Sequence, residues 1–124
     1  MMMAATQIVA MVVEDDPSTR EFLVRALAKQ GIETQEAATV GEALVMLEQE
    51  PLPTVLILDL MLPDASGTIL LRRIKRDALP IRVAVVTGVK DPYAFWDVLR
   101  FPPDRLFRKP LDLAELVAWL QQGP

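Results

Sequence analysis

Acidic side chains follow two apolar runs of this sequence, and their chemistry suits a divalent cation. Glu14 and Asp15 come directly after the apolar run 8–13, and Asp59 comes directly after the apolar residues 55–58. Carboxylates that meet in one place repel one another, and a divalent cation relieves that repulsion. Because hard oxygen ligands favour Mg²⁺ or Mn²⁺ over zinc, we expect a Mg²⁺ or Mn²⁺ site at these residues.

A hydroxyl group and an ammonium group follow two further strand-like segments. Thr87 comes after the segment 81–86, which is apolar apart from Arg82, and Lys109 closes the segment 105–108. A hydroxyl, an ammonium and a metal ion that converge on Asp59 would stabilise a phosphoryl group there. Carboxylates serve as phosphoryl acceptors in proteins, so these residues indicate phosphoryl transfer to Asp59.

Strand-like segments alternate with helical patterns five times along the chain. We expect strands at 8–13, 32–37, 55–58, 81–86 and 105–108, and helix starts at Asp16, Thr39, about Gly67, Asp91 and Asp112. This alternation predicts an α/β fold, a (βα)5 doubly wound parallel five-stranded sheet of flavodoxin-like order 2-1-3-4-5. That order would place Glu14, Asp15 and Asp59 in one crevice, at the switch point between strands 1 and 3.

Helical spacing also predicts which side chains face the core. In the first helix, Phe22, Leu23, Ala26 and Leu27 are expected to form the buried stripe. The helix after Gly67 carries four cations that we expect on its exposed side, namely Arg72, Arg73, Lys75 and Arg76.

Composition limits the function classes. The 124 residues, with 52% hydrophobic and 24% charged residues, suit one globular domain over 1–124 with no output domain in this chain. The sequence has no cysteine and no histidine, which excludes disulfides, thiolate zinc sites and imidazole bases. A net charge of −4 disfavours direct nucleic-acid or membrane partners. The apolar start is too short to span a bilayer, so a cytoplasmic location is expected.

Four segments in this order resemble the receiver domain of two-component response regulators (the CheY-like family). They are V-V-E-D-D-P-S, L-I-L-D-L-M-L-P-D-A-S-G, V-V-T-G and F-R-K-P, and the match covers essentially the whole chain. The resemblance implies that Asp59 accepts a phosphoryl group from the phosphohistidine of a sensor histidine kinase or phosphotransfer protein, with Mg²⁺ as cofactor.

The resemblance also implies roles for the neighbouring residues. Asp15 matches the acid that binds Mg²⁺ directly, Glu14 the neighbour that acts through water, and the backbone carbonyl of Met61 a further ligand. Thr87 matches the switch hydroxyl and Lys109 its ion-pair partner.

Three further positions have secondary assignments. Pro110 matches a proline whose preceding peptide bond is often cis in this family. Asp16 is expected mainly as a helix cap, with contact to the metal shell as the alternative. Leu106 stands where the family usually has Tyr or Phe, which puts the usual coupling between threonine and a rotating aromatic in doubt.

We therefore expect a phosphorylatable signalling receiver and not a metabolic enzyme. Phosphorylation would switch the face of helix 4, strand 5 and helix 5, read by a protein effector or by an output domain absent here. The sequence leaves homodimerisation open. Two alternatives are a receiver-like interaction module that works without phosphate and a small aspartate-nucleophile phosphatase. The phosphatase is disfavoured because such enzymes typically carry a second acid where this chain has Met61.

Overall fold

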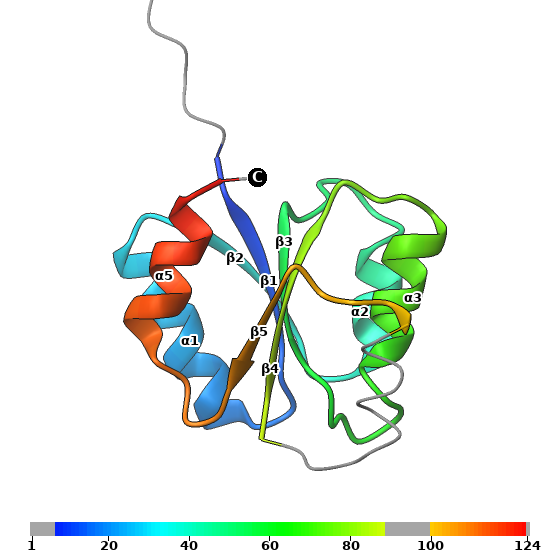
Figure 1. The fold of residues 1–124 in the computed structure, drawn as a ribbon, viewed down its shortest axis with the longest axis horizontal. Helices are drawn as coiled ribbons and strands as arrows, with labels where there is room; N and C mark the ends of the chain where they lie inside the picture. Colours follow the sequence, from blue (N-terminus) through cyan, green and yellow to red (C-terminus); the bar gives the residue numbers. More distant parts are fainter. Residues whose placement is uncertain (1–6, 89–99, 124) are drawn as a thin grey trace, which may run out of the picture.

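The computed structural model describes residues 7–88 and 100–123, which form one parallel sheet covered by helices on both faces (Figure 1). The elements in chain order are β1 (Val9–Val13), α1 (Pro17–Lys29), β2 (Glu33–Ala37), α2 (Val40–Met46), β3 (Val55–Asp59), α3 (Thr68–Arg76), β4 (Arg82–Thr87), β5 (Arg105–Arg108) and α5 (Leu113–Gln121).

The five strands run parallel in the order β2-β1-β3-β4-β5, which confirms the predicted fold class and strand order. The helix expected between Asp91 and Arg100 lies outside the described residues except for its last residue. None of the helices in the described ranges has the length and apolar character that a membrane span requires.

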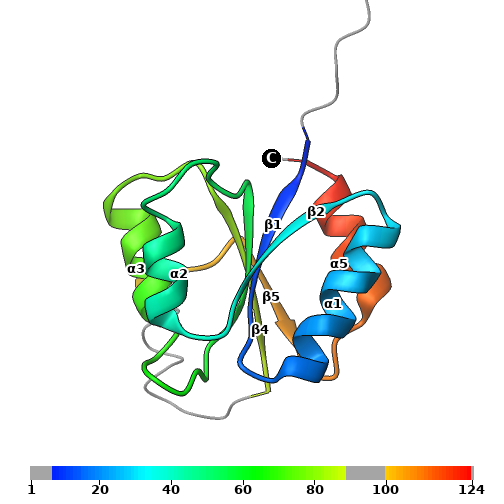
Figure 2. The same ribbon diagram turned by 180° about the vertical axis from the view of Figure 1, so that it is seen from behind.

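Successive strand residues point to opposite faces of the sheet, and this alternation builds two separate hydrophobic layers. Met11 and Val13 of β1 pack with α2 and α3, whereas Ala10 and Val12 pack with α1 and α5. Figures 1 and 2 show the two helix pairs on opposite sides of the sheet. Every residue of β3 is buried, as expected for a central strand covered on both faces.

The helix starts follow the sequence prediction because their capping side chains are local. Asp16 Oδ2 accepts a hydrogen bond from the Thr19 backbone N–H at 2.8 Å. At α2, Thr39 Oγ1 accepts from the Glu42 N–H at 3.0 Å, and a Glu42 carboxylate oxygen accepts from the Ala38 N–H at 2.6 Å. Thr39 therefore caps α2 as the spacing predicted, while Glu42 reaches the N–H one residue before the cap and not the N–H of Thr39 that a strict capping box uses.

One side chain of the predicted core stripe of α1 was placed wrongly. Phe22 is 60% exposed, whereas Leu23 and Leu27 are buried and Ala26 is half-buried. Leu23 and Leu27 are four residues apart and share the face that meets the sheet. Phe22 precedes Leu23 by one residue, about 100° around the helix, and this rotation carries its ring out to the surface.

Arg82 at the start of β4 holds the carboxyl end of α5. Its guanidinium donates to the backbone carbonyls of Leu120 at 3.1 Å and Gly123 at 3.0 Å. The same group lies 4.4 Å from the centroid of the Trp119 ring. Because the last carbonyls of a helix lack partners within the helix, a cation there both satisfies and neutralises them.

Removing this guanidinium should therefore destabilise the fold. We expect Arg82→Met to lower the free energy of unfolding by about 2 kcal/mol in urea denaturation, because charge-assisted hydrogen bonds are lost. The control is Arg25→Met, since Arg25 is 76% exposed and its ion pair is with Glu21, which is also exposed. Equal losses in the two variants would contradict the role assigned to Arg82.

Candidate metal and phosphoryl site

The strand register brings the predicted site residues to one edge of the sheet. Val13 pairs with Leu58, so Glu14 and Asp59 occupy the next level on neighbouring strands β1 and β3. On the other side of β3, Asp59 pairs with Val86, and Thr87 follows at the end of β4. The carboxyl ends of parallel strands lie at the same sheet edge, so the acids and the Thr87 hydroxyl share that edge.

Three carboxylates form an acidic cluster at this edge. One oxygen each from Glu14, Asp15 and Asp59 lies within 4.8 Å of the others. Glu14 and Asp59 are buried, while Asp15 is exposed. A set of hard oxygen donors converging at this spacing fits Mg²⁺ or Mn²⁺, as the sequence predicted.

Both carboxylate oxygens of Asp59 have hydrogen-bond donors. Lys109 Nζ lies 3.0 Å from Asp59 Oδ2 and 3.8 Å from a Glu14 carboxylate oxygen. The Met61 backbone N–H donates to Asp59 Oδ1 at 2.9 Å. The peptide bond between Lys109 and Pro110 is cis, the isomer that the resemblance implied. The Asp59 carboxylate is thus held in one orientation at the mouth of the site.

Burial and a neighbouring carboxyl group shift the proton affinity of Glu14. Its pKa is raised from 4.5 to about 7, mainly by burial and also by Asp59, against the opposing effects of a hydrogen bond from the Asp16 N–H and of the Lys109 charge. Burial lowers the pKa of Lys109, but its hydrogen bond to Asp59 and the nearby acids raise it to a net value above normal. The cluster therefore carries more negative charge than Lys109 alone balances, which favours a bound cation.

Arg20 of α1 is a site residue that the sequence analysis missed. Its guanidinium donates to the backbone carbonyl of Glu14 at 2.7 Å and to a Glu36 carboxylate oxygen at 3.3 Å. It thereby fixes the backbone of the acidic β1–α1 connection against β2. The available signal was its position one turn into a helix that starts directly after the acids.

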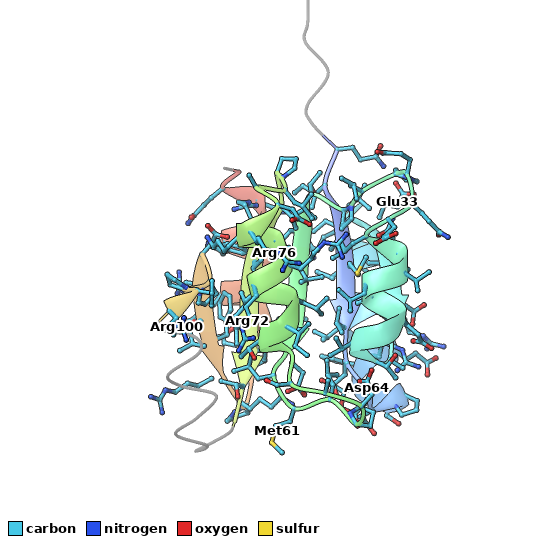
Figure 3. The ribbon with its side chains drawn as sticks, turned by 90° about the vertical axis from the view of Figure 1, so that its right-hand side faces the viewer. Glu33, Met61, Asp64, Arg72, Arg76 and Arg100 are labelled. Carbon is cyan, nitrogen blue, oxygen red and sulfur yellow. The ribbon has the colours of Figure 1, made fainter. Side chains whose placement is uncertain are left out.

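The remaining predicted residues lie around this cluster. Asp16 is exposed and caps α1, and it is outside the group of acids whose oxygens converge. Thr87 is half-buried at the end of β4. Leu106 is 39% exposed, while its neighbour Phe107 is buried on the other face of β5. The Met61 side chain is exposed and points away from the fold, as Figure 3 shows. Its backbone N–H instead donates to Asp59 Oδ1.

An apolar cavity of about 260 Å³ opens beside the acidic cluster. Glu14, Asp59 and Lys109 line its polar side. Its apolar wall includes Phe22 of α1 together with Pro110 and Leu111 of the β5–α5 connection. The exposed ring of Phe22 therefore stands next to the carboxylate that the sequence predicted as the phosphoryl acceptor.

Residues 10–121 match the family described as the response regulator receiver domain. The response regulator protein PilR of Pseudomonas aeruginosa is 32% identical over 86% of this chain and 24% of PilR. The phosphate regulon transcriptional regulatory protein PhoB of the same species is 32% identical over 90% of this chain and 49% of PhoB. The chain thus spans about a quarter and about half of these two curated relatives.

The three-dimensional comparison agrees with the sequence comparison. The crystal structure of a CheY-like response regulator receiver domain protein from Methanospirillum hungatei aligns with a TM-score of 0.85 at 26% identity. The alignment covers 94% of this chain and 93% of that one. This level of agreement extends over nearly the whole of both folds.

The raised pKa of Glu14 predicts a pH-dependent stability of the metal-free protein. Its folded pKa of about 7 exceeds the ordinary 4.5, so this stabilisation is complete below 4.5 and lost as the pH rises through 7. Between about pH 5.5 and about pH 8, urea denaturation in EDTA should show a loss of about 2 kcal/mol from this residue. The raised pKa of Lys109 acts only in the alkaline range.

Glu14→Gln provides the matched control because it keeps the shape of the side chain and removes its titration. As the pH rises from about 5.5 to about 8, the free energy of unfolding of the variant should increase relative to that of the wild type by about 2 kcal/mol. A parallel pH dependence in the two proteins would refute the assignment to Glu14.

Proposed function

Because this chain belongs to the response regulator receiver domain family, we propose that Asp59 accepts a phosphoryl group from the phosphohistidine of a sensor histidine kinase or phosphotransfer protein. The observation that carries this proposal is the Asp59 carboxylate, held between Lys109 Nζ and the Met61 N–H beside two further acids. In the reaction, an Asp59 oxygen forms a bond to phosphorus while the phosphorus–nitrogen bond of the donor breaks. The leaving imidazole keeps the bonding electrons and takes up a proton.

The proposed roles follow from charge and position. Glu14, Asp15, Asp59 and the Met61 carbonyl would hold Mg²⁺, which neutralises charge on the phosphoryl oxygens when bound. Lys109 lies in hydrogen-bonding distance of Asp59 Oδ2 and orients the carboxylate. Phosphorylation adds about −1.5 to −2 charges, which would draw Lys109 and the Thr87 hydroxyl toward the new group.

We further propose that this response changes the surface formed by β5, α5 and the segment that precedes β5. Leu106 is part of that surface because it is 39% exposed on β5. A partner that binds one arrangement better than the other would then read the phosphorylation state. That partner would be a protein effector or an output domain. A second copy of this chain is a further candidate partner for the same surface.

The phosphoryl donor would dock on α1 beside the cavity. Phe22 is 60% exposed and lines the cavity that Asp59 also lines. Pro110 and Leu111 extend this apolar rim across the β5–α5 connection. A protein that buries this rim would bring its phosphohistidine to the Asp59 carboxylate.

The phosphoacceptor role predicts a covalent mass gain at one residue. Incubation of the wild type with Mg²⁺ and acetyl phosphate should add the mass of one phosphoryl group in intact-protein mass spectrometry. Asp59→Asn should abolish this gain because the nucleophilic carboxylate is gone. Asp77→Asn, at the exposed end of α3, is the control and should retain it.

No gain in the wild type would leave a phosphate-independent interaction module as the better description, and a gain that persists in Asp59→Asn would remove the phosphoacceptor role from Asp59. Steady hydrolysis of a generic phosphate ester by the wild type would instead support the phosphatase.

The docking role of Phe22 predicts a defect that depends on the donor. With a phosphohistidine protein that phosphorylates the wild type, Phe22→Ala should slow transfer about tenfold, because an exposed aromatic anchor is lost. Its rate with acetyl phosphate should stay within about twofold, since a small donor needs no docking surface. Val45→Ala is a matched control, because Val45 is also 60% exposed but lies on α2. Equal slowing with both donors would place the defect at the site itself and refute docking.

A further inference from the structure

Asp64 joins the β3–α3 connection to the first turn of α2. Its Oδ1 accepts a hydrogen bond from the Val40 N–H at 3.0 Å, and its Oδ2 accepts from the Gly41 N–H at 2.9 Å. Figure 3 shows Asp64 at the edge of the sheet where Met61 also lies. These two hydrogen bonds lower the pKa of Asp64, so the carboxylate is ionised when it holds the helix.

The connection that carries Asp64 is folded tightly over the end of β3. Met61 and Ser66 form an isolated antiparallel bridge, and the Gly67 N–H donates to the Leu60 carbonyl at 2.8 Å. A side chain at Gly67 would place its Cβ only 2.5 Å from the Asp59 carbonyl oxygen. The base of this loop is therefore fixed directly against the phosphoacceptor strand, and Asp64 attaches its tip to α2.

Asp64 also completes a ring of contacts around the acidic cluster. The Glu14 N–H donates to the Ala37 carbonyl at the end of β2 at 3.0 Å, and α2 begins a few residues later. Asp64 then connects the start of α2 to the loop that follows Asp59. These contacts connect the backbone of Glu14, through the end of β2 and the start of α2, to the loop that follows Asp59.

Asp64 shares the capping of α2 with Thr39 but comes from another element. Thr39 Oγ1 accepts from the Glu42 N–H, and Asp64 accepts from the Val40 and Gly41 N–H groups. Asp64 comes from 24 residues beyond Val40, so its bonds restrain two elements against each other as well as satisfying the helix end. Thr39 caps the same helix end through a bond within that end of the chain, and it is therefore the matched local cap.

We propose that Asp64 is a positioning residue that holds the β3–α3 loop, and with it the Met61 backbone, in the orientation that the acidic cluster needs. This inference rests on the proposed function for the role of Met61 as a metal ligand. Residues that orient metal ligands from outside the first layer typically change metal affinity about 10- to 100-fold when they are removed. Asp64 does not itself contact the cluster and acts through the loop.

The test compares the full chain as wild type, Asp64→Ala, Asp64→Asn and Thr39→Ala, which removes the local cap of α2. Hydrogen exchange in metal-free protein reports on the Met61 and Gly67 amides, and calorimetric titration with Mg²⁺ alone reports the dissociation constant. We expect Asp64→Ala to accelerate exchange at these two amides at least about fivefold more than Thr39→Ala does, and to weaken Mg²⁺ binding about tenfold. Asp64→Asn should show exchange rates and a Mg²⁺ affinity between those of the wild type and Asp64→Ala, because its amide oxygen still accepts one N–H.

The outcomes separate this inference from the function on which it rests. Exchange at Met61 and Gly67 that differs by less than about twofold between Asp64→Ala and Thr39→Ala would overturn the positioning role, because loss of a cap then explains both. Wild type that binds no Mg²⁺ would count against the proposed function, and the metal-free exchange rates would still decide the role of Asp64. Unequal exchange with equal Mg²⁺ affinities would refute the link to the metal site.

Discussion

Like charges held close together at the carboxyl edge of the sheet are the constraint on which this molecule depends. Glu14 and Asp59 are buried next to each other, and Asp15 adds a third carboxylate. Lys109 supplies one nearby positive charge, and the pKa of Glu14 is still raised to about 7 by burial and by Asp59. Such a site gains from a cation.

The rest of the fold supplies the rigidity that this constraint requires. Parallel pairing aligns the ends of β1, β3 and β4, and helices on both faces exclude water from the strands that carry the acids. At the opposite edge of the sheet, Arg82 fastens the end of α5 through backbone carbonyls. The sheet thus separates an edge where Arg82 holds a helix end from an edge where the acidic cluster lies.

Connections between elements determine how the acidic groups face one another. Arg20 ties the carbonyl of Glu14 toward β2, and Asp64 ties the loop after Asp59 to α2. Each of these contacts uses a charged side chain on backbone groups, which gives direction as well as attraction. The acidic cluster is therefore supported on the β2 side by bonds that a change in the adjoining loops would disturb.

The sequence by itself determined the strand and helix order, the helix caps at Asp16 and Thr39, and the position of Asp59 at a strand end. Those features depend on short-range rules: apolar runs, local capping bonds and the parallel order that alternating elements impose. Only the tertiary structure decided that Phe22 is exposed, that Arg20 reaches Glu36, and that Asp64 holds α2. Each of these depends on the rotation of a helix or on a contact between segments at least 16 residues apart, and neither is encoded in local spacing.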